Sequence, residues 1–116
     1  MNARAQREDF EVARLLEERA AVGRPYFEFL RVPHLSAGVY VLSVGAVDGQ
    51  SPHTEDELYL VLSGRGEFRL GEESRPVGPG SLCFVPANAR HAFHSVTEEL
   101  QLLAVFGPAE RESGSS

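Results

Sequence analysis

GAVDGQSPHTEDELYLVLSG, residues 45–64, is the stretch that decides how the rest of this sequence is interpreted. It contains an apolar run, residues 58–62, that is typical of a buried strand. In an extended chain alternate side chains share one face, so the odd-numbered positions from His53 to Val61 point the same way. An imidazole and a carboxylate, those of His53 and Glu57, therefore face an apolar interior, where burial is costly without a partner. A bound cation would be such a partner.

The composition narrows the class of protein. With 116 residues and 42% hydrophobic content, the chain predicts one domain with a modest core. The net charge of −6 argues against nucleic acid as a partner, because phosphate binding needs a concentrated basic face. The sequence has neither an apolar run long enough to span a bilayer nor an apolar secretory segment at its start, so we expect no membrane association. A single cysteine, Cys83, favours a reducing, cytoplasmic location.

The N-terminal part of the chain predicts a helix over residues 7–22, which are rich in Ala, Leu, Glu and Arg. Val12, Leu15 and Leu16 form an apolar face, and Gly23 followed by Pro25 is a stop signal. We expect this helix to pack on the outside of a sheet or on a second subunit.

From residue 26 onward, short runs rich in Val, Leu, Phe and Tyr alternate with turn residues. This pattern predicts an all-β sandwich or barrel. Residues 64–66, Gly-Arg-Gly, predict a tight reversal between neighbouring strands, and residues 71–74 predict a second hairpin turn. The predicted strands are residues 26–32, 38–47, 57–63, 66–71, 81–86 and 100–107.

Two motifs in this sequence resemble those of the cupin family. The first, G-x5-H-x-H-x3,4-E-x6-G, matches at Gly45, His53, Glu57 and Gly64, with Ser51 in place of the first histidine.

The second motif, G-x5-P-x-G-x2-H-x3-N, matches at Gly80, Pro86 and His91. Asn88 replaces a glycine there, and Asn is the residue other than Gly that best tolerates a left-handed backbone. Ser95 replaces the final Asn.

The resemblance implies a cupin double-stranded β-helix, or jelly-roll barrel, carrying an N-terminal α-helix. On this interpretation residues 1–24 form a helical extension, residues 25–109 form the barrel, and residues 110–116 form a polar, disordered tail.

The resemblance also implies that His53, Glu57 and His91 together hold one divalent metal ion per chain. Two imidazoles and a carboxylate suit several first-row ions, so Fe, Mn, Zn, Ni and Cu are not distinguished. Because a serine is a weak ligand, Ser51 either leaves one more coordination position open or a neighbouring residue takes its place. Gln50, Glu55 and Asp56 are the neighbours available. Glu55 has the right parity, although we interpret it as an exposed acid at the mouth of the barrel.

Other residues are assigned to the cavity wall or the surface by parity. Tyr59 and Phe93 share the inward face of the ligands, as cavity wall or as core filling. His94 faces away from His91 on the same strand, and His34 follows Pro33 in an exposed loop. Cys83 alternates with Leu82 and Phe84 in an apolar strand and is expected to be a buried structural thiol.

The function predicted is that of a metal-binding cupin with a small-molecule pocket. As an enzyme it would be a metal-dependent dioxygenase, or an isomerase or lyase in which the ion polarises a carbonyl or carboxylate. The general base is not identified, with Glu55 and Tyr59 as the candidates. The alternatives are a non-catalytic sensor or storage protein for a metabolite or metal, and a barrel that is merely filled. We expect a homodimer, formed through apolar surface on the N-terminal helix and residues 26–30.

Overall fold

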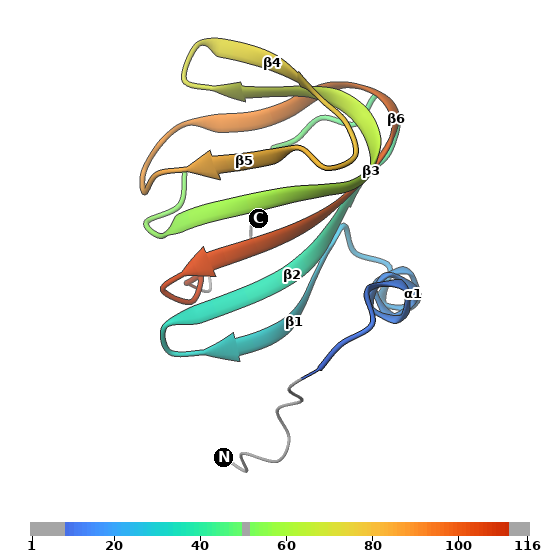
Figure 1. Ribbon diagram of the computed structural model, residues 1–116, viewed down its shortest axis with the longest axis vertical. Helices are drawn as coiled ribbons and strands as arrows, with labels where there is room; N and C mark the ends of the chain where they lie inside the picture. The colour runs from blue at the N-terminus through green and yellow to red at the C-terminus, as the bar shows by residue number, and fades with distance from the viewer. Residues whose placement is uncertain (1–8, 50–51, 112–116) are drawn as a thin grey trace.

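A computed structural model describes residues 9–49 and 52–111 of the chain. Within these residues the chain forms one helix and a six-stranded sheet (Figure 1). The predicted all-β architecture with an N-terminal helix is therefore confirmed. The helix is α1 (Val12–Val22), and the strands are β1 (Tyr26–Val32), β2 (Leu35–Leu42), β3 (Asp56–Leu70), β4 (Glu73–Val77), β5 (Leu82–Val85) and β6 (His91–Gly107).

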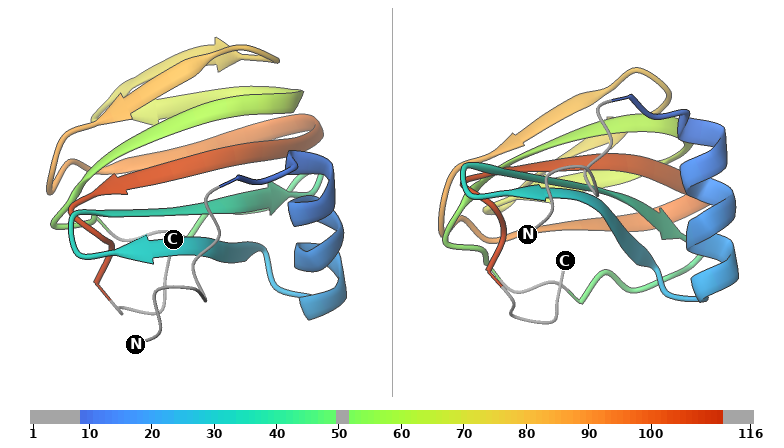
Figure 2. Two further views of the ribbon diagram at one scale, coloured as in Figure 1. Left: turned by 60° about the horizontal axis from the view of Figure 1, so that its bottom comes forward. Right: turned by 90° about the horizontal axis from the view of Figure 1, so that it is seen from below.

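The two longest strands, β3 and β6, form the centre of the sheet. They run antiparallel from the pair Asp56–Gly107 to the pair Leu70–His91. On the other side of β3, β5 pairs with its first part and β4 with its last part. The second part of β6 pairs with β2, which pairs with β1. The strands twist and curl, so that the sheet bends around one interior, as Figures 1 and 2 show.

The predicted reversal at residues 64–66 is wrong, because these residues lie inside β3. Gly64 has a φ of 95°, and the pairing of β3 with β6 shifts register on both sides of it. A Cβ atom at Gly64 would collide with the carbonyl oxygen of Glu99 on β6. The glycine therefore allows an irregularity that bends two paired strands together, where the sequence pattern indicated a turn.

The other turn predictions fare better. The hairpin turn predicted at residues 71–74 is confirmed, since β3 ends at Leu70 and β4 begins at Glu73. The predicted strand 26–32 has the bounds of β1. The predicted strand 38–47 is shifted in the structure, where β2 runs from Leu35 to Leu42. A turn follows, closed by a hydrogen bond from the N–H of Ala46 to the carbonyl of Ser43, and in it Gly45 has a φ of 75°.

The helix is shorter than predicted, beginning at Val12, and residues 9–11 are not helical. It ends as predicted at Gly23, a left-handed residue whose N–H donates to the carbonyl of Arg19 at 2.9 Å. Leu15 is buried, and the helix packs against β1 and β2 (Figure 2). Of the two expected roles, the helix thus takes that of covering the chain's own sheet. No helix in residues 9–49 or 52–111 has the length and apolar character needed to cross a membrane.

The core lies on the inner face of the curled sheet. Glu57, Tyr59 and Val61 of β3 are buried, whereas Leu58, between Glu57 and Tyr59, is 41% exposed, which confirms the predicted alternation. Tyr59 and Phe93 also lie inward as predicted, with their ring centroids 4.9 Å apart, and Cys83 is buried. The apolar core comprises Tyr40, Leu42, Tyr59, Val61, Phe68, Val77, Cys83, Val85, Phe93, Val96, Leu100, Leu102, Ala104 and Phe106.

Candidate metal centre

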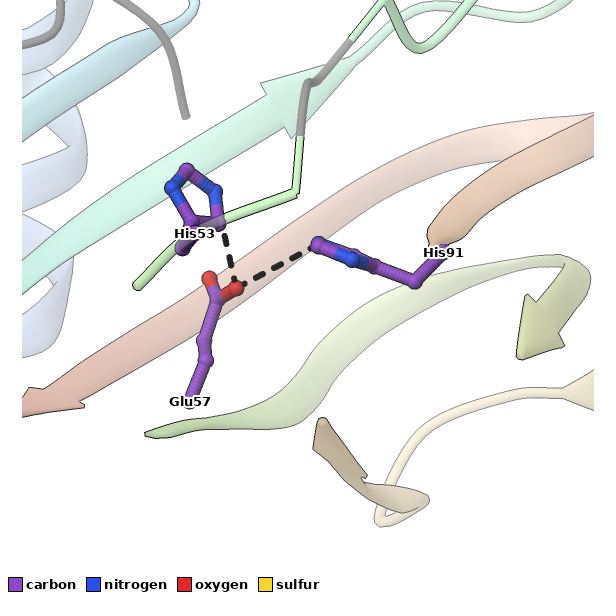
Figure 3. A group of neighbouring side chains, drawn as sticks. All are labelled: His53, Glu57 and His91. Carbon is purple, nitrogen blue, oxygen red and sulfur yellow. Dashed lines mark ion pairs between the residues drawn. The ribbon is translucent and has the colours of Figure 1, made fainter. Parts of the chain in front are cut away.

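Three side chains that are distant in sequence meet in the interior: those of His53, Glu57 and His91. Each offers one ligand atom, and these atoms lie within 4.8 Å of one another. Oε1 of Glu57 lies 3.8 Å from Nε2 of His53 and 3.4 Å from Nε2 of His91 (Figure 3). All three residues are buried, with Glu57 only 1% exposed. The structure therefore brings together the three residues that the two motifs singled out.

Each of the three is held by a different part of the sheet. Glu57 is near the start of β3 and pairs with Val85 of β5 on one side and Phe106 of β6 on the other. A position between two strands has little freedom, so the carboxylate is aimed by the backbone.

The histidines are held from the loops that precede β3 and β6. His53 accepts a hydrogen bond at its carbonyl oxygen from the N–H of Asn88, at 2.6 Å. Asn88 has a φ of 69°, the left-handed conformation expected at this position. His91 begins β6, and its Nδ1 lies 3.0 Å from the carbonyl oxygen of Ala89, which leaves Nε2 directed at Glu57.

The charges at this centre are only partly compensated. Within the described part of the chain, neither carboxylate oxygen of Glu57 has a hydrogen-bond partner, although both are buried. Burial lowers the pKa of His53 below its ordinary value, against the opposing effect of Glu57. Burial also lowers the pKa of His91, but the Glu57 carboxylate beside it outweighs this effect, and the pKa is raised overall. A buried acid with two unsatisfied oxygens is costly unless a cation neutralises it.

The donor set fits a divalent ion. Two imidazole nitrogens and a carboxylate oxygen from three directions are the ligands that first-row metals accept in proteins, and three protein ligands leave open coordination positions. The unsatisfied oxygens of Glu57 are the atoms that such an ion would engage.

Glu110 is a site residue that the sequence analysis missed. It was expected to begin a disordered tail, and this is wrong: Glu110 is 5% exposed, and its Oε2 lies 3.4 Å from Nδ1 of His53. Its N–H donates to Oγ of Ser36 and its carbonyl oxygen accepts from Arg31. These contacts come from β1 and β2, which are distant in the sequence, so the local sequence around Glu110 does not predict its burial. Residues 112–116 lie outside the described residues.

The position of Glu110 perturbs its carboxyl group. Burial, together with the nearby carboxylates of Glu57 and Glu55, raises the pKa of Glu110 to about 8. The interior beside the metal centre is therefore rich in acidic groups.

Glu55 was interpreted as an exposed acid, and this is also wrong, because it is 4% exposed. Its Oε2 accepts hydrogen bonds from Thr54 Oγ1 at 2.7 Å and from the N–H of Arg111 at 3.2 Å. Glu55 does not belong to the group of three ligand atoms. Gln50 and Ser51 lie outside the described residues, so their role in coordination remains a prediction.

A second missed residue, Asp48, supports the wall of the centre. Its two carboxylate oxygens accept hydrogen bonds from the hydroxyl of Tyr40 and from the N–H of Phe93, both at 2.8 Å. Asp48 thus joins the segment before β3 to β2 and β6, an interaction that alternation alone does not predict.

The remaining predictions for aromatic and histidine side chains hold. The hydroxyl of Tyr59 lies 3.5 Å from Nε2 of His91. Phe68 packs against the ring of His91, and Phe93 packs against Phe68 and Tyr59. His94 lies away from the centre, with Nε2 2.8 Å from Oγ of Ser74. His34 is exposed.

Residues 38–106 match the cupin domain, a span that holds all three candidate ligands. Since this is more than half of the sequence, the chain belongs to the cupin family, as its curled antiparallel sheet and its inward-facing histidines and glutamate indicate.

Three relatives show how far the similarity extends. An uncharacterised protein from Streptomyces coelicolor is 44% identical over 101 residues, which cover 87% of this chain and 96% of that protein. An acireductone dioxygenase from Bacillus mycoides is 38% identical over 58 residues, covering 46% of this chain but only 34% of that enzyme. The solved structure of TT1209 from Thermus thermophilus shares the fold, with a TM-score of 0.71 at 24% identity, covering 88% of this chain and 98% of the other.

Proposed function

We propose that this chain binds one divalent first-row metal ion through His53, Glu57 and His91 and acts with it on a small organic molecule. The observation that carries the proposal is the buried Glu57 carboxylate, which faces two imidazole nitrogens and has no hydrogen-bond partner among the described residues. A cation at this point would satisfy the acid and both histidines at once.

The leading reaction class is an oxygen-dependent oxidation or cleavage. An ion bound by two histidines and one carboxylate supplies open positions for water, oxygen or a substrate oxygen atom, which is the arrangement used by non-haem Fe(II) oxygenases. The name of the B. mycoides relative supports this class over isomerisation or elimination.

Aromatic side chains lie along one side of the proposed metal site. Tyr59, Phe68 and Phe93 form an aromatic wall beside His91. Such a wall excludes water and favours an apolar or planar substrate.

The second candidate is a binding protein without turnover. It is favoured by the state of the acids near the centre, because Glu55 and Asp48 already accept hydrogen bonds within the fold. Glu55, a candidate general base, is therefore engaged in the structure.

Elemental analysis of protein purified without chelator tests the metal site. We expect about one metal ion per chain, as for a single three-ligand site, and strong loss in His91→Ala. His94→Ala is the matched control, since His94 lies on the same strand but away from the centre, and it should retain the metal. Equal metal content in the parent and His91→Ala would remove the proposed site.

Oxygen uptake distinguishes the two candidates. Protein loaded with Fe(II) and given an acireductone should consume oxygen, and His91→Ala should not. Stabilisation by that compound without oxygen uptake or product would favour the binding protein instead.

A further inference from the structure

The imidazole of His53 lies between two buried carboxylates. Its Nε2 is 3.8 Å from Oε1 of Glu57, and its Nδ1 is 3.4 Å from Oε2 of Glu110. Both acids are more than nine-tenths buried. A histidine that binds a metal through one ring nitrogen can donate a hydrogen bond from the other. In His53, Nε2 is placed to bind the ion and Nδ1 is placed to donate to Glu110.

Glu110 is brought to His53 by backbone contacts of the C-terminal strap, which we define as residues 108–111. The N–H of Ala109 donates to the carbonyl of Pro33, and that of Glu110 donates to Oγ of Ser36 at 2.8 Å. Arg31 donates to the carbonyl oxygen of Glu110 at 2.6 Å. Because these contacts use the backbone of Glu110, the strap does not depend on its carboxylate.

The second histidine of the centre, His91, is also contacted at Nδ1, but by a neutral group. Nδ1 of His91 lies 3.0 Å from the carbonyl oxygen of Ala89, so a neutral group orients that ring. For His53 the corresponding group is an acid. Oε2 of Glu110 accepts no hydrogen bond from the described residues, and its 3.4 Å distance exceeds a formed N–H···O bond, about 2.7–3.2 Å, by little.

We propose that Glu110 is a positioning residue of the metal centre, accepting a hydrogen bond from Nδ1–H of His53 so that Nε2 presents its lone pair to the ion. This inference rests on the proposed function. With a divalent ion bound nearby, its positive charge favours the ionised form of Glu110, and the carboxylate then fixes the tautomer and orientation of the ring and makes Nε2 a stronger ligand. Glu110 acts through His53 and is not itself a ligand, in agreement with its absence from the group of three ligand atoms.

A competition titration tests this role. Co(II) is added to metal-free protein in the presence of a chromophoric chelator, for the parent, Glu110→Gln and Glu67→Gln. Loss of an acid that orients a ligating histidine typically weakens metal binding about 10–100-fold, and we expect this for Glu110→Gln. Glu67→Gln is the matched control, because Glu67 lies on β3 like Glu57 but alternates with the buried Phe68, so it faces away from the core, and it belongs to no ligand group. Its affinity should stay within about threefold of the parent's, since no ligand is reoriented.

Two further measurements separate positioning from other roles. The thermal unfolding midpoint in chelator should not fall in Glu110→Gln, because the strap is held by its backbone and the amide fills the same space. The visible absorption spectrum of the Co(II) complex should indicate the same coordination geometry in Glu110→Gln as in the parent, since the ligand atoms are unchanged.

The outcomes are distinct. Equal Co(II) affinity in the parent and Glu110→Gln would overturn the role of Glu110. So would a fall in the thermal unfolding midpoint of the metal-free variant that is large enough to account for its loss of Co(II) affinity. A change of coordination type in the Co(II) spectrum would show direct ligation and also overturn it. A parent protein that binds no Co(II) would instead overturn the proposed function.

Discussion

At the scale of single residues, Glu57 is a buried, nearly inaccessible acid whose carboxylate has no hydrogen bond from the described residues. A buried carboxylate in this position lowers the stability of the metal-free protein, and binding of a cation beside it should raise that stability.

Glu57→Gln should therefore have opposite effects on the metal-free and metal-loaded protein. Without metal, the neutral amide should raise the free energy of unfolding by about 1 kcal/mol or more, because a buried charge that lacks hydrogen bonds from the described residues is removed. With Zn(II), the parent should gain several degrees in thermal midpoint and the variant almost none. Thermal unfolding in chelator and in excess Zn(II) measures both effects. A variant that is still stabilised by Zn(II) as strongly as the parent would contradict the ligand role of Glu57.

Cys83 gives a prediction that depends on pH. Burial raises the pKa of its thiol, so the fold favours the protonated form. The associated stability is complete below the ordinary thiol pKa, about 8.5, and is lost as the pH rises through the raised value.

At pH 8 we thus expect native Cys83 to react slowly with a disulfide reagent, and rapidly in denaturant, since the thiolate is the reactive form. The rate of absorbance change on labelling measures this, with Cys83→Ser as the blank. Labelling of the native protein as fast as in denaturant would refute the buried, protonated thiol.

At the scale of elements, β3 and β6 carry the geometry of the centre. Glu57 lies in the first part of β3, and His91 begins β6 at the far end of the paired strands. The two residues approach each other only because both strands bend, and Gly64 allows the bend in β3. The irregularity at Gly64 therefore helps to bring the candidate ligands Glu57 and His91 together, although Gly64 lies apart from both in the sequence.

Gly64→Ala should destabilise the protein more than Gly71→Ala, its matched control. Both glycines have positive φ, which costs an alanine about 1–2 kcal/mol. Gly71 lies in open space, whereas a Cβ atom at Gly64 meets the backbone of Glu99. We expect the cost at Gly64 to exceed that at Gly71 by about 1 kcal/mol or more. Urea denaturation measures the difference, and equal costs would show that the bend tolerates a side chain.

At the scale of the whole molecule, the outer face of the sheet has an apolar area. Leu58, Leu82 and Phe84 are 41%, 66% and 55% exposed, and they lie together because Leu58 pairs with Phe84 across β3 and β5. We defined the expected dimer surface on the N-terminal helix and residues 26–30, but Leu15 is buried against the chain's own sheet and Phe29 packs on Phe10. The homodimer stays a prediction, and we now propose the exposed apolar face of β3 and β5 as its interface.

Phe84→Glu should accordingly shift a dimer toward monomer, because a charge would be buried at the centre of that face. Light scattering coupled to size exclusion measures the mass. Val22→Glu, at an exposed apolar position of α1, is the control and should remain dimeric. A monomeric parent at working concentration would contradict the predicted dimer. If only Val22→Glu dissociates the dimer, the interface would lie on α1 instead.

The inward face of residues 53–61 and the left-handed conformation at Asn88 were predictable from sequence, because both follow from local backbone physics. Alternation in a strand and the tolerance of Asn for positive φ need no knowledge of distant residues. The two motifs added His91, which periodicity alone does not link to Glu57.

The tertiary structure alone decided three matters: that Gly64 bends a strand, that Glu55 is buried, and that Glu110 lies beside His53. A short glycine-containing segment such as residues 64–66 can form either a turn or a bend within a strand. The strand that pairs with it, here β6, decides which of the two forms. An acidic residue near the chain's end is buried only if remote groups satisfy its backbone, as Ser36 does for Glu110 across 74 positions. Local patterns carry no record of such partners, because the contacts exist only once the sheet has closed around its interior.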